Sequence, residues 1–385
     1  MSTLGSQPAL GSRPALGSRP ALLSRPALRW LVPAGLAVVI LGAGAATTAI
    51  RAAAGDNLPP RTVQQLLVDL QSARLDAGSG TVIEHADFGL PALPDGVGGD
   101  GSAQFDSLVV GAHTLRVWYD GPDSARIALV GALGESDVTH SGSNLWIWSS
   151  ADNTATRMTV PTVPTIPSGI APTSLPSAIT PAAVATDILS ALTPTTSITS
   201  GSSTTIAGRP SYELVIAPKD AASLVASVHI AIDADRHIPL QVQIYAKGTA
   251  KPAFEIGYSQ ISFAKPDPSV FAFNPPPGVK IKQAATPSGG AQPDGTTADR
   301  PTILGSGWSA VVSGGIPFTD NGPGGQGDKT IDAIAKHLPT VSGSWGSGKL
   351  LKTKLFTALL VDDGRVYVGA VNSEALIATV AAAAK

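Results

Sequence analysis

The sequence predicts an α+β protein in which antiparallel strands predominate and helices are few. Most of the chain after residue 58 consists of short stretches that alternate apolar and polar residues between Gly, Pro, Asn or Asp turns. Only a few stretches repeat apolar residues at helical spacing. The 385 residues also include 41 Gly and 32 Pro, which suit turns and linkers better than helices.

Composition excludes several classes of function. The net charge of −2 provides no broad basic field that would recruit nucleic acid. The absence of cysteine excludes disulfides, thiolate metal sites and cysteine nucleophiles. It also excludes a lipidated N-terminal cysteine, so attachment to a membrane would require a helix.

The first residues form a low-complexity repeat. Residues 5–28 are four copies of a six-residue unit, GSQPAL, GSRPAL, GSRPAL and LSRPAL. Proline in every copy prevents a regular helix, and each copy has too little apolar surface to fold. We expect residues 1–29 to be a disordered cytoplasmic tail; a partner-binding repeat is the alternative.

Residues 30–50 carry no charge and predict a transmembrane helix, since about 20 apolar residues span a bilayer. Four arginines precede this segment and the first acid, Asp56, follows it. The positive-inside rule then places the tail in the cytoplasm and the bulk of a single-pass plasma-membrane protein outside. A cleaved signal peptide is the alternative, because Ala43-Gly44-Ala45 and Ala52-Ala53-Ala54 fit small-residue cleavage sites. Both readings export residues 55–385.

The exported part opens with an amphipathic pattern. Val63, Leu66, Leu67 and Leu70 share one face of a helix, and residues 181–192 predict a second helix. Residues 161–180 are uncharged and interrupted by prolines, which indicates a long surface loop. Alternation predicts strands at 81–88, 113–120, 125–131, 137–140, 144–149, 154–160, 204–207, 211–217, 226–233, 240–246 and 253–263.

A smaller unit follows a linker. Strands at 355–361 and 365–371 meet at Asp362-Asp363-Gly364, a strong tight-turn signal. Residues 373–382 predict a helix. A Gly-rich loop at 314–327 and a short helix at 329–337 are also expected.

The strands have apolar character on both faces. Leu145 and Ile147 point to one side of their strand, while Trp146 and Trp148 point to the other. A sheet of this kind must cover its second face with helices, another sheet or an apolar ligand.

Several motifs resemble the LolA/RseB-like lipoprotein-binding fold. They are a strand, a Pro turn and an Arg-led strand at 113–127 (HTLRVWYDGPDSARI), the Gly turn and Trp-rich strand at 142–148, Ile238-Pro239-Leu240, and residues 271–278 (FAFNPPPG). Residues 79–94 (SGTVIEHADFGLPALP) resemble membrane-anchored LolA-like proteins of high-GC actinobacteria. The resemblance covers roughly residues 58–281.

This resemblance implies a curved, incomplete antiparallel β-barrel that helices cap, with an apolar cavity for acyl chains. Members of the family are carriers or sensors rather than enzymes. The long loop, the added C-terminal unit and the anchor depart from the pattern, and they favour a fixed receptor or sensor over a shuttle. The implied divisions are a tail at 1–29, a membrane helix at 30–50, a LolA-like domain at 58–281, a linker at 282–303 and an extension at 304–385.

The implied ligand is a lipid or the acyl chains of a lipoprotein. The alternative is an RseB-like envelope sensor in which residues 304–385 bind an anti-sigma factor or another membrane partner. The candidate cavity-lining residues are Leu115, Val117, Trp118, Tyr119, Trp146, Trp148, Leu240, Val242 and Tyr245.

No catalytic, metal or cofactor site is predicted. The chain has neither an H-E-x-x-H nor a G-x-S-x-G motif. Glu84, His85 and Asp87 cluster on one strand, but alternation brings only two of them to one side. Residues 343–350 (GSWGSGKL) resemble a phosphate-binding loop, yet Leu350 lacks the hydroxyl that would bind magnesium. The residues that follow favour a strand.

Overall fold

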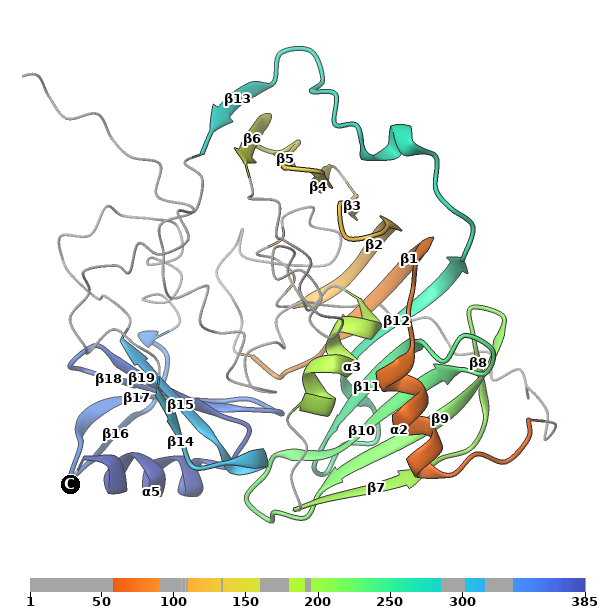
Figure 1. Ribbon diagram of the computed structural model, residues 1–385. Helices are drawn as coiled ribbons and strands as arrows, with labels where there is room; N and C mark the ends of the chain where they lie inside the picture. Colours follow the sequence, from red (N-terminus) through yellow and green to blue (C-terminus); the bar gives the residue numbers. More distant parts are fainter. Residues whose placement is uncertain are drawn as a thin grey trace, which may run out of the picture.

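The structure is a computed structural model that describes residues 58–90, 105, 108, 110–132, 134–159, 180–190, 195–284, 302–315 and 335–384 (Figure 1). The predicted tail, the predicted membrane helix, residues 161–179 of the predicted loop, the Gly-rich stretch from 316 and most of the predicted 329–337 helix lie outside the described residues. In the described part of the chain, no helix combines the length and apolar character needed to span a bilayer.

A large antiparallel sheet dominates the structure, as predicted. Its thirteen strands follow the order β13-β6-β5-β4-β3-β2-β1-β12-β11-β10-β9-β7, and β8 also pairs with β9. Only the pairing of β13 with β6 is parallel. The strands are β1 (Ala77–Ala86), β2 (Gly111–Asp120), β3 (Ser124–Val130), β4 (Glu135–Ser141), β5 (Asn144–Ser149), β6 (Thr154–Thr159), β7 (Thr196–Ser200), β8 (Thr204–Ile206), β9 (Arg209–Pro218), β10 (Val225–Asp233), β11 (Pro239–Ala246), β12 (Pro252–Ser262) and β13 (Lys280–Gln283).

Both predicted amphipathic helices are present and pack on one side of this sheet. They are α2 (Val63–Ser72) and α3 (Pro181–Ser190), which lie against the β7–β12 half (Figure 1). Leu66, Val184 and Ile188 are 1–2% exposed and join the core beneath the helices. We call this side the inner face of the sheet and the opposite side the outer face.

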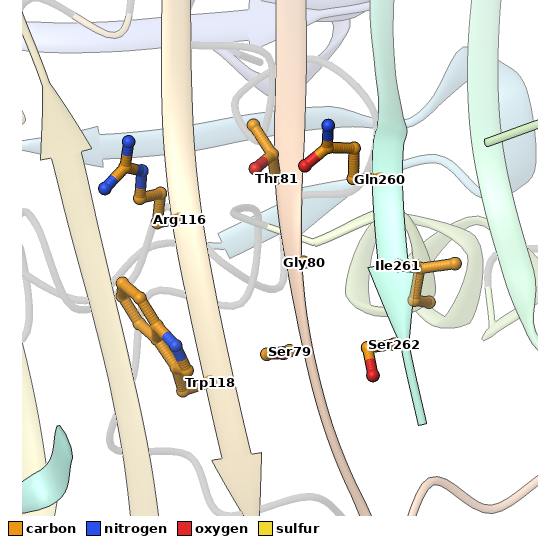
Figure 2. A pocket seen from close by; sticks show the side chains of 8 residues that line it. All are labelled: Ser79, Gly80, Thr81, Arg116, Trp118, Gln260, Ile261 and Ser262. Carbon is orange, nitrogen blue, oxygen red and sulfur yellow. The ribbon is translucent and has the colours of Figure 1, made fainter. Parts of the chain in front are cut away.

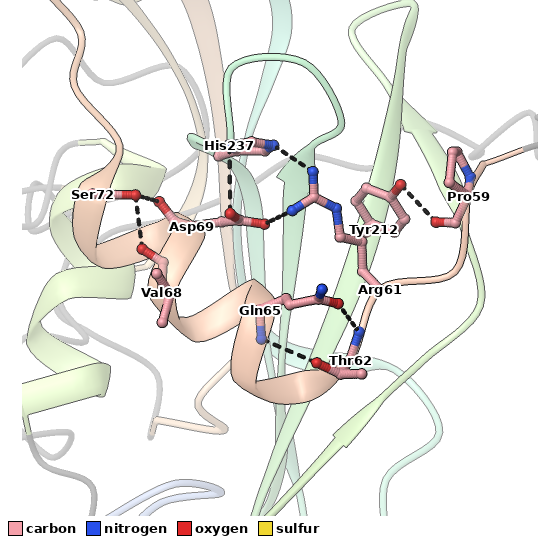
Figure 3. A network of polar contacts seen from close by, with 9 residues as sticks. All are labelled: Pro59, Arg61, Thr62, Gln65, Val68, Asp69, Ser72, Tyr212 and His237. Carbon is pink, nitrogen blue, oxygen red and sulfur yellow. Dashed lines mark hydrogen bonds and ion pairs between the residues drawn. The ribbon is translucent and has the colours of Figure 1, made fainter.

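Polar contacts fix the start of α2 on the sheet. Thr62 and Gln65 form a capping box, in which each side chain accepts a hydrogen bond from the other residue's backbone N–H. Arg61 Nη1 lies 2.7 Å from Asp69 Oδ2, and the Tyr212 hydroxyl on β9 donates to the carbonyl of Pro59 at 2.8 Å (Figure 3). These contacts set the position at which the apolar face of α2 meets the core.

The C-terminal unit forms a second antiparallel sheet of six strands in the order β14-β15-β19-β18-β17-β16. The predicted tight turn is confirmed, with Gly364 at φ +88° between β18 and β19. Residues 343–350, which resembled a phosphate-binding loop, form part of the β16–β17 hairpin, and β17 continues to Lys352. The elements are β14 (Thr302–Leu304), β15 (Val311–Gly315), β16 (Thr340–Gly343), β17 (Gly346–Lys352), β18 (Thr357–Val361), β19 (Arg365–Gly369) and the predicted helix α5 (Ser373–Ala383).

The C-terminal unit has a core of its own, and it also contributes residues to the hydrophobic core of the large sheet. Trp308 and Phe356 of the C-terminal unit belong to the same buried cluster as the inner face of the large sheet. The rings of Phe88 and Phe356 lie 6.2 Å apart, edge to face. Trp308 Nε1 donates to Thr196 Oγ1 at 2.8 Å, and the Leu224 N–H donates to the Ala370 carbonyl at 2.8 Å. The C-terminal unit is therefore packed firmly against the main domain.

The chain between β12 and β13 crosses the outer face. These residues, 264–279, which we call the strap, contain a short 3-10 helix at Pro268–Phe271 that contacts β3 and β4. Figure 1 shows the strap leaving β12 and arching past β2–β5 before β13 returns beside β6. The sequence did not predict β13, because KIKQ is only four residues long and has a single apolar residue.

Candidate functional site

The nine predicted lining residues do not share one surface. Successive side chains of a strand point to opposite faces of its sheet, so neighbours in the sequence separate. The prediction that they line one cavity is therefore wrong. The inner face carries Leu115, Val117, Tyr119, Leu240 and Val242, whereas the outer face carries Trp118, Trp146, Trp148 and Tyr245.

The inner face is closed where the helices cover it. Leu240 and Val242 on β11 are 0% exposed, and α3 packs directly on β11 and β12. Their neighbours Ile230 and Ile256 are also fully buried. This half of the inner face is a packed core, so its two predicted lining residues contact protein side chains.

The inner face stays apolar beyond the helices. Ile127, Val138, Leu145 and Met158, on β3 to β6, are 4–7% exposed. The last three form a separate buried cluster, with partly buried Phe105 and others packed against it. Neither α2 nor α3 makes its main contacts with these strands. The apolar inner face therefore extends over more strands than the described helices cover.

One carboxyl group interrupts this apolar surface. Glu84 on β1 is 5% exposed and lies directly opposite His113 on β2, which is 3% exposed. No described residue gives the Glu84 side chain a hydrogen bond or an ion pair. Burial raises the pKa of Glu84 well above its ordinary value of 4.5. The group is therefore held towards its neutral, hydrogen-bond-donating form.

The outer face carries a ladder of two Trp–Arg pairs with a threonine between them. Trp118, Arg126, Thr139, Trp146 and Arg157 lie opposite one another on five consecutive strands, β2 to β6. The Arg126 guanidinium lies 5.2 Å from the Trp118 ring centroid, and that of Arg157 lies 5.6 Å from the Trp146 ring centroid. Both distances are typical of cation–π contacts.

A first cavity of about 320 Å³ opens at one end of this ladder (Figure 2). It is open to solvent and polar along its floor. No described carboxylate forms an ion pair with Arg116, which borders it. The cavity is lined by Ser79, Gly80, Thr81, Arg116, Trp118, Gln260, Ile261 and Ser262.

A second cavity of about 240 Å³ lies under the strap. Phe273 of the strap reaches the ladder, with its ring 5.0 Å from that of Trp146 and 6.4 Å from that of Trp148. This cavity combines aromatic, aliphatic and charged walls. It is lined by Arg126, Glu135, Asp137, Thr139, Trp148, Val270, Ala272, Phe273, Asn274 and Pro276.

The wall of the second cavity carries one guanidinium and two carboxyl groups. Arg126 donates from Nε to Asp137 Oδ1 at 3.2 Å and from Nη2 to Asp137 Oδ2 at 2.8 Å, and its Nη2 lies 3.5 Å from Glu135 Oε1. Burial raises the pKa of Asp137 although Arg126 opposes the shift, and burial together with the nearby Asp137 charge raises the pKa of Glu135. Both carboxyl groups of this wall therefore share the one guanidinium of Arg126.

Two residues that line this cavity each bury a polar atom that has no hydrogen-bond partner among the described residues. They are Thr139 Oγ1, on a residue that is 1% exposed, and Trp148 Nε1. Buried polar atoms in folded proteins nearly always have a partner, so each such atom calls for an explanation.

The described residues offer no evident metal site. Within them, no group of three His, Asp or Glu side chains could hold an ion. Asp87 extends towards the C-terminal unit, where Lys354 Nζ lies 2.6 Å from Asp87 Oδ2. The predicted cluster at Glu84, His85 and Asp87 is thus divided between a buried inner-face carboxyl and a salt bridge at the interface between the units.

Comparison with known proteins returns structures only. No family model matches the chain, and no curated protein matches it. A Pseudomonas aeruginosa MucA/MucB complex structure matches at 14% identity over 83% of this chain and 96% of the other, with a TM-score of 0.42. A LolA superfamily protein from Nitrosomonas europaea matches at 12% identity over 56% of this chain and 99% of the other, with a TM-score of 0.20. A LolA superfamily protein is thus among the matching structures, and at these TM-scores the likeness supports no conclusion about fold, ligands or partners.

Proposed function

We propose that this chain is a membrane-anchored extracytoplasmic binding protein that holds lipid or lipoprotein acyl chains against the inner face of β2–β6. The observation that carries the proposal is the apolar inner face that continues beyond α2 and α3. Val138, Leu145 and Met158 form a buried aliphatic cluster there, 4–7% exposed, on strands that neither helix mainly contacts. Burying one methylene group contributes about 0.8 kcal/mol, so part of an acyl chain suffices for binding.

The location in this proposal comes from the sequence. Residues 30–50 would anchor the chain in the plasma membrane with residues 1–29 in the cytoplasm. Anchoring holds the inner face close to the bilayer, from which an acyl chain could enter. The chain would act by binding, without catalysis.

Photo-crosslinking tests this proposal. The full chain, reconstituted in bilayers with a phospholipid that carries a photoreactive group in its acyl chain, should be labelled within residues 115–158. Met158→Gln should reduce that labelling about fivefold or more, because an unpaired buried amide costs about 1–3 kcal/mol. Thr159→Gln is the matched control, since Thr159 is the next residue of β6, is exposed, and points to the outer face. Labelling restricted to residues 30–50, or equal loss in both variants, would contradict the proposal.

A second candidate function is an envelope sensor that binds an anti-sigma factor or another membrane protein through residues 304–385. The observation that favours it is the shared core: Phe356 and Trp308 pack into the main domain, so a change at the inner face would reach the C-terminal unit. Ile303 on β14, immediately before these residues, offers a contact point at their edge, because it is 57% exposed.

A photoreactive amino acid at position 303 should then capture a defined membrane protein in cells. The same probe at Val68, which is 62% exposed on α2, serves as the control for random collision. Identical adducts from the two positions would count against the sensor.

A further inference from the structure

We propose that the first cavity, on the outer face where β2, β1 and β12 lie side by side, binds a phosphate group. The polar side chains of this cavity lie on the opposite side of the sheet from the proposed acyl-chain surface, so the proposal is independent of that function. It rests on an arginine without an ion pair, on the donors that surround it, and on the absence of acidic side chains among the described residues that line the cavity.

Strand register brings the polar lining residues together. Residues directly opposite one another on neighbouring strands share a face of the sheet. Figure 2 shows the Thr81 and Gln260 side chains beside each other, with Arg116 and Trp118 on the neighbouring strand β2. The two rows that cross β2, β1 and β12 on the outer face are Arg116, Thr81 and Gln260, and Trp118, Ser79 and Ser262.

A β-bulge in β12 gives this part of the outer face its polar character. The register of β12 on β1 shifts at Thr81, where Ser259 is an extra residue. The Ser259 hydroxyl donates to the Thr81 carbonyl at 3.3 Å, which holds the bulge in place. Without the extra residue, Ser259 would take the place of Gln260 on the outer face, and the apolar Ile261 would take the place of Ser262. Bulges often redirect side chains next to functional sites.

Short side chains leave room between longer ones. Ser79 and Thr81 on the central strand are short, whereas Arg116, Trp118 and Gln260 on the flanking strands are long. The resulting cavity of about 320 Å³ is larger than a phosphate group. It therefore also has room for part of the molecule that carries the phosphate, and Trp118 provides an apolar wall for that part.

Arg116 supplies a positive charge that no contact neutralises. Its side chain is exposed, and no described carboxylate forms an ion pair with it. Asp120, the next outward-facing residue of β2 after the lining residues, is engaged by Lys265 at 2.9 Å. Glu135 is within range of the charge of Arg116, but its ion pair is with Arg126. The cavity is thus a cationic site.

This wall selects an anion with several oxygen atoms. A guanidinium presents its N–H donors in a planar fork that matches carboxylates and phosphates. The hydroxyls of Ser79 and Thr81 and the amide of Gln260 can donate as well. A carboxylate has two oxygens in one plane, which the fork of Arg116 occupies by itself. A tetrahedral phosphate presents further oxygens to the donors on β1 and β12.

Isothermal titration of the full chain in dodecyl maltoside micelles, which contain no phosphate, tests the assignment. The probes are inorganic phosphate, glycerol 3-phosphate and dibutanoyl phosphatidic acid, with glycerol as the neutral match and glycerate as the carboxylate match. Ionic strength is held constant, because salt screens exposed charges. We expect at least one phosphate probe to bind about tenfold more tightly than both matches, as for one charge-assisted hydrogen bond.

The probes also distinguish two sources of the phosphate. Binding of inorganic phosphate or glycerol 3-phosphate indicates a soluble phosphate compound. Binding of phosphatidic acid alone indicates a lipid headgroup if the affinity depends on Arg116, because acyl chains by themselves could bind at the inner face.

Three variants separate binding from folding. Arg116→Gln should weaken phosphate binding about tenfold or more. Arg157→Gln is the matched control, because Arg157 is also an exposed outer-face arginine but lies on β6, which three strands separate from β2. It removes the same charge and should leave the affinity unchanged. Thr81→Val keeps the shape of the side chain but removes its hydroxyl, and should weaken binding about threefold. Melting temperatures of all three should stay within about 2 °C of the unchanged chain.

Three results would overturn the assignment. One is that no phosphate probe binds more tightly than glycerol, which would mean that the cavity holds water only. Another is that glycerate binds as tightly as the phosphate probes. The last is that Arg116→Gln and Arg157→Gln have the same affinity for the probe that binds, whichever probe that is. None of these results bears on acyl-chain labelling at the inner face.

Discussion

The helix-covered half of the inner face and the strap-covered part of the outer face belong to one sheet but are completed differently. Beneath the helices, Leu66 and Ile188 fill the space and are 1–2% exposed. Beneath the strap, a cavity remains, and Thr139 and Trp148 each bury a polar atom that no described residue pairs. Apolar surfaces need only matching volume, whereas polar groups need partners in fixed directions. A short strap can fill volume far more easily than it can provide hydrogen-bond partners in the required directions.

The largest expected change in the free energy of unfolding is in the helix-covered half of the inner face. Leu66→Ala should lower the free energy of unfolding by about 3 kcal/mol, because it leaves a cavity in a packed core. Val68→Ala, two residues away on the same helix but 62% exposed, should change it by less than about 0.5 kcal/mol. Urea unfolding followed by circular dichroism measures both. Similar losses in the two variants would show that α2 does not close this core.

A smaller change in the free energy of unfolding is expected at Asp233, in the turn that follows β10 beside α2. Asp233 is 0% exposed, and it accepts hydrogen bonds from Arg209 and from the backbone N–H groups of Asp235 and Arg236. Burial by itself raises the pKa of Asp233, but Arg209 and the two amides together outweigh burial and lower it. Asp233→Asn should therefore destabilise the fold by about 2 kcal/mol at neutral pH.

The pH dependence of this loss has a defined sign. A carboxyl whose pKa is lowered by folding stabilises the fold above its unfolded pKa, and that contribution disappears as pH falls through the folded value. The difference between the unchanged chain and Asp233→Asn should thus be constant near pH 7 and shrink below about pH 4. Unfolding midpoints at several pH values measure it. A difference that grows in acid would show that the ion pair is not the cause.

The smallest effect should be a gain in the stability of the fold when Glu84, on the inner face outside the helices, is replaced. Burial raises the pKa of Glu84, so the unfolded chain releases this proton at a lower pH than the folded chain does. Stability is therefore lost as pH rises from the unfolded pKa towards the folded one. Glu84→Gln removes the titration and should be more stable than the unchanged chain by about 1 kcal/mol or more at pH 8, with less gain near pH 5.

Glu255→Gln is the control for that substitution. Glu255 lies on the neighbouring strand β12 but on the outer face, where it accepts hydrogen bonds from Gln241 at 2.8 Å and Gln243 at 3.1 Å. Its replacement weakens these bonds and should not stabilise the fold. If both variants gain the same stability, burial of Glu84 is not the reason for the gain.

The sequence predicted the elements better than the site. Periodicity located α2, α3 and α5, and the turn at Gly364 is the one that its Asp-Gly signal favoured. Alternation correctly separated Trp146 and Trp148 from Leu145 and Ile147. Alternation does not show which face the helices cover. The nine predicted lining residues therefore included residues from both faces of the sheet. The motif at 271–278 was noticed, but nothing in it showed that Phe273 would lie over the two tryptophans.

Local chemistry thus determined which residues form strands, helices and tight turns, because those choices depend on neighbours within a few positions along the chain. The same chemistry determined that both faces of the sheet would carry apolar or aromatic side chains. Only the tertiary structure decided what covers each face. That choice depends on contacts between residues far apart in sequence, such as Phe273 with Trp146 and Phe356 with Phe88. It is also what left Thr139 and Trp148 facing a cavity under the strap.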